Sequence, residues 1–172
     1  VFNVVERMDE EFFTSHLGPG EYDVIKTGDT VLSGTRQGWD ELRDFISTTD
    51  FSNQANFEEL SRRVDIGNFT SYVILNLWTL NLDWPHNNWR ASRHKPDGLF
   101  RFINWDTEWA FDKSTSHNTI RNQLSNISPP WGNADIAKLF NGLKVSPEYQ
   151  MIFADRAHRH FYNGGGLTDS EI

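Results

Sequence analysis

The chain has 172 residues, a length that suits a single domain, and its 24 acidic and 16 basic residues give a formal net charge of -8 at pH 7. A surface of that sign repels phosphate and argues against a general nucleic-acid binder, although a local cation or a metal ion would still allow a nucleotide ligand. The absence of cysteine excludes a disulfide scaffold and a thiolate metal site. No stretch is long and apolar enough to span a membrane.

Large aromatic side chains account for 14% of the residues, with seven tryptophans among them. Exposed rings of this kind can form a sugar-binding platform. Most of them lie within apolar segments, however, so we expect them to build the core.

The first third of the chain alternates predicted strands with predicted helices. Residues 1–5 and 21–26 are rich in β-branched and aromatic side chains, which indicates strands. Between them, residues 8–18 predict a short helix, because acidic side chains fill its first turn and Gly18 follows its last residue. Residues 35–48 place apolar side chains at helical spacing and predict a longer helix.

Two further helices are predicted in the middle of the chain. Residues 56–64 begin with a capping box, in which Asn56 is the cap and Glu59 follows three positions later. Residues 65–82 place apolar side chains around most of the helix circumference, so we expect this helix to be buried at the centre of the domain. The β-branched run within it would also suit a strand, but its length favours a helix.

A β-hairpin is predicted next, with its turn at Lys95–Gly98, where proline takes the second position. If the turn is centred on its two middle residues, the numbers of paired residues sum to about 193, by the pairing rule of antiparallel strands. Asn87 then faces Asp106, and Asn88 faces Trp105. A slip of one residue would exchange which asparagine points inward.

The last third of the chain is expected to contain one loop and two helices. Residues 112–133 are polar and interrupted by prolines, which indicates a loop. Residues 134–143 and 146–165 predict helices, the second with Ser146 as its cap and Gly164 after its end. The order of these elements is that of an α+β domain.

Short polar side chains gather around the start of the hairpin. Asp83 lies where the buried helix ends, and the hairpin register brings Asn87 and Asn88 beside Asp106. Together with Glu108, these residues offer hard oxygen ligands that suit Mg²⁺, Mn²⁺ or Ca²⁺. Protein kinases use a comparable set, in which a catalytic aspartate orients the hydroxyl, and an asparagine five residues later and a further aspartate hold the metal ions. The same residue types are common in turns, so a helix-ending loop followed by an ordinary hairpin is the alternative.

The chain contains, in this order, the segments VVERMDEEFF, YDVIK, NLDWPHNNW, FINWDTEWAFD and FYNGGGLT. In sequence, order and separation they resemble the CotH family of atypical secretory protein kinases, which is named for a bacterial spore-coat protein. The resemblance implies a single domain over residues 1–172 with a protein-kinase-like fold. In that domain residues 1–30 would form the end of the small lobe and the hinge, and residues 31–172 the helical large lobe with the hairpin that carries the site.

The resemblance also implies an activity. ATP and Mg²⁺ or Mn²⁺ would be bound, and the γ-phosphate would pass to a serine or threonine of a secreted, spore-coat or cell-surface protein. Asp83 would be the catalytic residue, and Asp106 would bind the metal ion in the role of the kinase DFG aspartate. Asn88 would supply the metal-binding amide, or Asn87 if the register slips.

Four other residues complete the predicted site. By the resemblance, Glu6 in VVER would lie at the end of the small lobe near the adenine. Lys26 is a candidate cation for the nucleotide, with a surface lysine as the alternative. His86 could position the loop or contact phosphate, or it could simply pack the loop. Glu108 stands where the family more often has a second aspartate, and its longer side chain would change the geometry or choice of the metal ion.

The family's domain usually begins before the first residue of this sequence. We therefore expect the phosphate-binding lysine and most of the small lobe to be missing, so that this piece is inactive alone. Two alternatives on the same fold are a non-catalytic binding or adhesion module and a Ca²⁺-stabilised structural domain. Arg90 and Arg93 lie on the hairpin, where either could face an anionic substrate or belong to a solvated face.

Overall fold

The computed structural model describes residues 6–111, 124 and 134–168. Within these ranges it contains six α-helices, one 3₁₀ helix and one four-stranded sheet, which confirms the predicted α+β class. None of the described helices has the length and apolar character needed to cross a bilayer. In chain order the elements are α1 (Glu10–Leu17), β1 (Tyr22–Lys26), η1 (Thr27–Asp29), β2 (Thr30–Ser33), α2 (Gln37–Thr48), α3 (Gln54–Ser61), α4 (Ile66–Trp78), β3 (Trp89–His94), β4 (Arg101–Asn104), α5 (Asp135–Leu143) and α6 (Pro147–Phe161).

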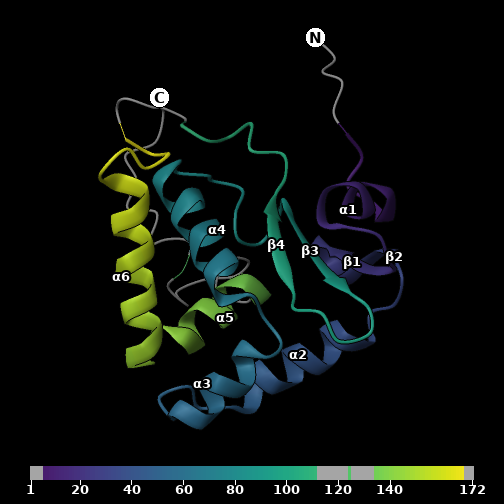
Figure 1. Cartoon of the computed structure of the whole chain (residues 1–172), viewed down its shortest axis with the longest axis horizontal. Coiled ribbons are helices and arrows are strands. Elements are labelled where there is room, and N and C mark those ends of the chain that lie inside the picture. The colour runs from purple at the N-terminus through teal and green to yellow at the C-terminus, as the bar shows by residue number, and fades with distance from the viewer. Residues whose placement is uncertain (1–5, 112–123, 125–133, 169–172) are drawn as a thin grey trace.

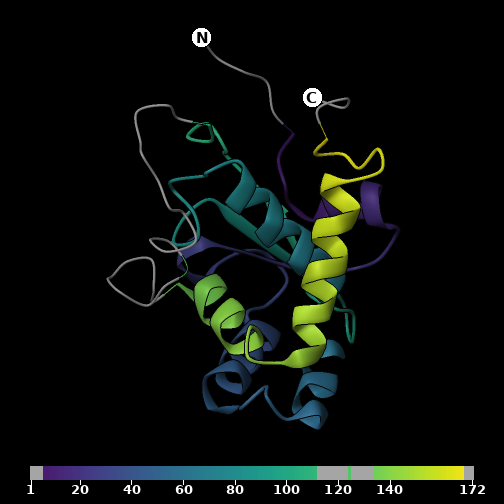
Figure 2. The ribbon, with the colours of Figure 1, turned by 90° about the vertical axis from the view of Figure 1, so that its left-hand side faces the viewer.

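Over the residues that the structure describes, the sheet has a single helix on one side and several longer helices on the other. Figure 1 shows α1 on one side of the sheet, α4 and α6 on the other, and α2 and α3 below. Figure 2 looks from the side of α5 and α6 and shows that a short turn joins these two helices. Helix α4 packs against both β4 and α6, so it is the buried central helix that the sequence predicts.

Alternate strand residues face two separate cores, as the pleat of a β-strand requires. Ile25, Ala91 and Phe102 face the large core, which the sheet shares with the helices that follow it in the chain. Val24 faces a smaller core, where it packs with Phe13 of α1. The sheet is therefore covered by helices on both faces, but only one face carries most of the hydrophobic burial.

The four strands are antiparallel and lie in the order β2-β1-β3-β4. Trp89 faces Asn104 across the hairpin, which is the register predicted from the sequence. The turn is wider than predicted, because the amide of Gly98 donates to the carbonyl of His94, at 2.8 Å, and not to that of Lys95. The ladder, and not the form of the turn, is therefore what brings the ends of the hairpin together.

Helix α4 begins at a side-chain cap and also closes the edge of the sheet. Asp65 caps the helix by accepting from the backbone amide of Asn68 at 2.9 Å. The Asn68 side chain in turn bonds to the outermost strand, accepting from the amide of Phe102 at 2.6 Å and donating to its carbonyl at 3.2 Å. One side-chain amide thus satisfies backbone groups that an edge strand would otherwise leave open.

The capping box predicted for the third helix is wrong. Helix α3 begins two residues earlier than expected, and its cap is Asn53, which accepts from the amide of Ala55 at 2.9 Å. Asn56 lies inside the helix and donates to the carbonyl of Asp50 at 2.8 Å. The structure uses the asparagine three positions earlier, which has no glutamate three residues on and so caps the helix without a capping box.

The cap and the following glycine predicted for the last helix are confirmed, whereas the central helix predicted at residues 65–82 ends at Trp78. Ser146 caps α6 by accepting from the amide of Tyr149 at 3.2 Å, and Gly164 follows the helix with a positive φ of 75°. The prediction missed β2, a short strand whose residues are exposed or only half buried. The strand predicted at residues 1–5 and, apart from position 124, the loop predicted at 112–133 lie outside the described residues. The lobe boundary at residue 30 stays a prediction.

Candidate functional site

The antiparallel order of the strands brings three strand ends to the same end of the sheet. Strand β1 ends there at Lys26, β3 begins there at Trp89, and β4 ends there at Asn104. The loop between α4 and β3 and the segment after β4 therefore meet at this end. These are the two segments in which the sequence places its candidate catalytic and metal-binding residues.

Buried side chains fix the loop between α4 and β3. Asn81 is fully buried and donates to the side-chain oxygen of Asn76 in α4, at 2.9 Å. Trp84 is also fully buried, and its indole nitrogen donates to the hydroxyl of Tyr72 at 2.7 Å. Burial raises the pKa of the Tyr72 hydroxyl above its ordinary value, so this group stays protonated. The tryptophan therefore packs and anchors the loop and does not form an exposed sugar platform.

The polar residues between these anchors converge on one carboxylate. Oδ2 of Asp83 accepts from Nδ2 of Asn87 at 2.8 Å and from Nδ2 of Asn88 at 2.9 Å. The same nitrogen of Asn88 donates to the backbone carbonyl of Asp106 at 3.0 Å. We call Asp83, Asn87, Asn88 and Asp106 the Asp83 cluster. The fold gathers these four residues as the hairpin register predicted, while their chemical roles stay predictions.

Backbone conformation helps to place two members of the cluster. Asn88 and Asp106 have positive φ angles of 54° and 52°. Asparagine and aspartate occupy this left-handed region more readily than other residues with a β-carbon. Each of these residues lies just outside a strand, where a positive φ interrupts the extended backbone of the ladder.

His86 lies against the same carboxylate from the other side. Its Nε2 atom is 3.4 Å from Oδ1 of Asp83. Burial lowers the pKa of His86 below its ordinary value, and the charge of Asp83 opposes this shift only in part. The imidazole is therefore mainly neutral at neutral pH. In that form it can orient Asp83 without cancelling its charge.

Three of the predicted site residues are less closely joined to the cluster. Glu6 lies beside α1, with its Oε2 atom 3.8 Å from Nε2 of His16. Glu108 is exposed. Neither acid forms a hydrogen bond or an ion pair with the cluster in the described part of the chain. Lys26 lies at the site end of β1, where its Cα is paired with that of Arg90.

The sequence did not identify the residues that support the cluster from behind. Tyr72, Asn76 and Asn81 hold the loop through hydrogen bonds, and Asn76 also donates to the side chain of Asn104 at the end of β4. One sequence feature could have indicated them: Asn76 and Asn81 are polar residues within and just after a helix that is otherwise mainly apolar. A buried amide needs hydrogen-bonding partners, so such residues indicate a polar network.

The cluster offers oxygen donors of the type that Mg²⁺ and Mn²⁺ prefer. Within the described residues no three acidic or histidine side chains surround a common point. The candidate metal ligands here are amide oxygens and a carboxylate. The bonds of Asn87 and Asn88 use their amide nitrogens and leave both side-chain oxygens available, and the Asp106 carboxylate makes no bond or ion pair with another described residue. A carboxylate and amide oxygens, completed by substrate phosphates, form a usual Mg²⁺ shell, so the residues fit such an ion.

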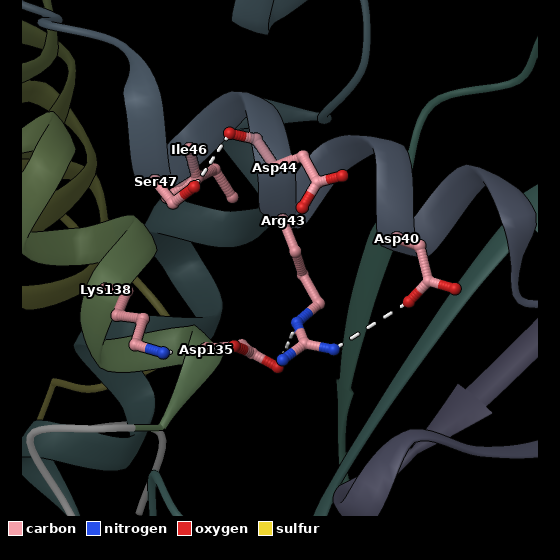
Figure 3. Close-up of a pocket in the computed structure, with 7 residues that line it drawn as sticks. All are labelled: Asp40, Arg43, Asp44, Ile46, Ser47, Asp135 and Lys138. Carbon is pink, nitrogen blue, oxygen red and sulfur yellow. Dashed lines mark hydrogen bonds and ion pairs between the residues drawn. The ribbon is translucent and has the colours of Figure 1, made fainter.

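A second charged cluster lies near the same end of the sheet. Nη1 of Arg43 is 2.8 Å from Oδ2 of Asp29, and its Nε is 3.1 Å from Oδ2 of Asp135. Figure 3 shows the Arg43 side chain reaching from α2 to Asp135 of α5. Burial raises the pKa of Asp135, and the charge of Arg43 opposes that shift. We call Asp29, Arg43 and Asp135 the Arg43 cluster, and it joins three elements by ion pairs.

Comparison with known families gives one match. A family model described as CotH kinase protein matches residues 1–163, which is nearly the whole chain. Searches of curated proteins and of solved structures gave no match.

Proposed function

Because this chain belongs to the CotH kinase family, we propose that it carries the catalytic large lobe of an ATP-dependent protein kinase. The acceptor would be a serine or threonine of a secreted, spore-coat or cell-surface protein. The observation that carries the proposal is the pair of amide hydrogen bonds to Oδ2 of Asp83, from Asn87 and Asn88. Neutral donors orient this carboxylate and leave its charge available for chemistry.

Asp83 would act on the acceptor hydroxyl. A carboxylate in this role accepts the hydroxyl proton and directs the oxygen toward the phosphorus atom. The asparagine bonds fix Oδ2, so the side chain cannot rotate freely, while His86 lies beside Oδ1. The buried anchors Asn81 and Trp84 on either side of Asp83 hold the backbone of this loop. Positioning of this kind is the main protein contribution to phosphoryl transfer.

Asp106 and Asn88 would hold a divalent ion, with Asn87 as a further donor. When bound, such an ion neutralises charge on the phosphate oxygens and orients the nucleotide. The bond from Asn88 to the Asp106 carbonyl ties the two segments together. It thereby keeps the two donors at a fixed separation.

The direct test is a phosphotransfer assay. The full-length protein would be incubated with γ-labelled ATP, Mg²⁺ or Mn²⁺, and a protein rich in exposed serine and threonine. We expect label in the acceptor with the wild-type protein and none above background with the double variant Asp83→Asn, Asp106→Asn. A matched control is Asp44→Asn on the exposed side of α2. Transfer that survives the double substitution would overturn the site assignment.

A non-catalytic binding module is a second candidate, and exposed aromatic side chains favour it. Trp109 and Phe111, just after the cluster, are 56% and 57% exposed. Calorimetry on the full-length protein separates the two candidates, because a binding module needs no nucleotide and a kinase binds ATP in a metal-dependent manner. If the domain instead used Ca²⁺ for rigidity, metal alone would raise its melting temperature and nucleotide would add nothing.

A further inference from the structure

Arg90, beside the Asp83 cluster, is a cation that forms no ion pair with any carboxylate the structure describes. Its guanidinium lies over the ring of Trp105, with Cζ 4.6 Å from the ring centroid. Nη1 donates to the backbone carbonyl of Trp89 at 3.2 Å. Among the described residues, Nε has no acceptor, and no carboxylate lies within ion-pair distance of the group. By contrast, the other described arginine of this strand, Arg93, pairs with the buried Asp23 at 2.8 Å.

The surroundings of Arg90 hold it in place without neutralising it. Stacking on an indole and a bond to a backbone carbonyl restrict the side chain but leave its positive charge intact. The Arg90 side chain is half-buried. A partly buried cation without a counter-ion gains from an anionic ligand, because the ligand replaces solvation that burial has removed.

The register of the sheet places a second cation next to Arg90. Lys26 is its directly paired residue on β1, so both side chains leave the same face of the sheet at its site end. No described carboxylate lies within ion-pair distance of Lys26. Two neighbouring cations therefore have no carboxylate within ion-pair distance in the described part of the chain, although the net charge of the whole chain is -8.

We propose that Arg90, with Lys26 beside it, binds the polyphosphate of the nucleotide and holds it against the Asp83 cluster. This inference rests on the proposed kinase function and adds a residue that positions the phosphates. A guanidinium suits the task because its planar set of N–H groups can bond two phosphate oxygens at once. It also offsets the repulsion that the carboxylates of Asp83 and Asp106 exert on a polyphosphate before a metal ion is bound.

The test measures binding without any transfer step. Calorimetry on the full-length protein would use two probes with Mg²⁺, ATP and inorganic tripolyphosphate. We expect Arg90→Met to weaken both by about tenfold or more, since it removes charge-assisted hydrogen bonds. Arg90→Lys should lose less, because it keeps the charge but not the planar donors. Arg62→Met is the matched control, since Arg62 is 71% exposed and belongs to a surface ion pair on α3, and it should leave affinity unchanged.

The outcomes separate this inference from the kinase proposal. Equal affinity of Arg90→Met and wild type for both probes would overturn the inference and leave the kinase proposal standing. Weakened ATP binding with unchanged tripolyphosphate binding would also overturn it, because the contact would then be to the nucleoside. A wild-type protein that binds tripolyphosphate through Arg90 but transfers no phosphate would support the inference and count against the kinase proposal. Melting curves confirm that each variant is folded.

Discussion

The Arg43 cluster and the Asp83 cluster both gather carboxylates near one end of the sheet, but they satisfy them in opposite ways. In the first, the cation Arg43 lies within 2.8 Å of Asp29 and 3.1 Å of Asp135. In the second, neutral amides bond Asp83 at 2.8 and 2.9 Å. Ion pairing cancels charge and favours stability, whereas amide bonds fix a carboxylate and keep it reactive. The difference separates a structural cluster from a chemical one.

The largest effect is expected for Asp83→Asn. This change removes the charge but keeps the shape and an acceptor for the neighbouring amides. Phosphotransfer by the full-length protein should fall by roughly 10²- to 10⁴-fold, the usual contribution of a general base. The free energy of unfolding should change by less than about 1 kcal/mol, because the described partners of Asp83 are two neutral amides and the mainly neutral imidazole of His86. The measurements are initial rates and urea unfolding, with Asp135→Asn as the control that should retain activity per folded molecule. If Asp83→Asn transfers phosphate at a near wild-type rate, the Asp83 cluster is not the chemical one, and the contrast with the Arg43 cluster does not hold.

The reverse pattern is expected for Arg43→Met. Asp29 and Asp135 lose the nearby guanidinium, and Asp135, which is only 14% exposed, keeps only the longer contact with Lys138 at 3.9 Å. We expect the free energy of unfolding to fall by about 1–3 kcal/mol, between the values for surface and buried ion pairs, since Arg43 itself is 34% exposed. Urea unfolding checks this. Arg36→Met removes an exposed ion pair with Asp40, which keeps its 3.8 Å contact with Arg43, and should destabilise the fold less because solvent screens such pairs. Equal losses for both variants would show that the cluster has no special role.

The two asparagines of the site should differ. Asn88 bonds both Asp83 and the Asp106 carbonyl, whereas Asn87 bonds only Asp83. Asn88→Ala should raise the Mg²⁺ or Mn²⁺ concentration for half-maximal activity by about tenfold or more, and Asn87→Ala by less, as for other residues that hold metal ligands in place. Titrating metal into an assay at fixed ATP measures both. A larger effect at Asn87 would show that this asparagine faces the metal ion.

The smallest effect is expected at His160, which lies outside both clusters. Burial, and then Arg156 and Arg159, lower its pKa below the usual 6.5. The unfolded chain therefore takes up the proton first as pH falls, so stability should decline as pH drops from 6.5 toward the lower folded-state pKa. Melting temperatures at pH 7.5 and 5.5 should differ less in His160→Gln than in wild type. If the difference in melting temperature between the two pH values is the same in His160→Gln and wild type, the pH dependence comes from a titrating group other than His160.

Local periodicity explains what could be predicted from the sequence. The apolar pattern of residues 65–82 predicted α4, and the spacing around Lys95–Gly98 predicted the strand register, because both depend on residues near in sequence. That register was sufficient to place Asn87 and Asn88 beside Asp106, even though the turn itself is wider than predicted. The placement of most aromatic residues within apolar segments indicated packing for the tryptophans, and Trp84 and Trp89 are buried.

Contacts between distant segments could not be predicted in the same way. The Arg43 cluster joins η1, α2 and α5, whose relative positions follow only from the complete fold. The stacking of Arg90 on Trp105 runs diagonally between strands, so simple pairing does not reveal it. The predicted cap of α3 was wrong even though Asn56, and not Asn53, is followed three residues later by a glutamate, so the local pattern favoured a position that the fold does not use as the cap. Strand β2 lacks buried alternation and so lacked a periodic pattern.

The amide of Asn68 limits how the folded chain can be modified. Asn68, Phe69 and Thr70 match the acceptor pattern of N-linked glycosylation. Both ends of that amide, however, bond the backbone of Phe102, and Thr70 is fully buried in α4. A sugar on Nδ2 would displace the contact that closes the edge of β4. Attachment of a glycan at Asn68 would therefore disfavour closure of this edge, and burial of Thr70 in the folded chain would hinder modification of Asn68 in a secretory compartment.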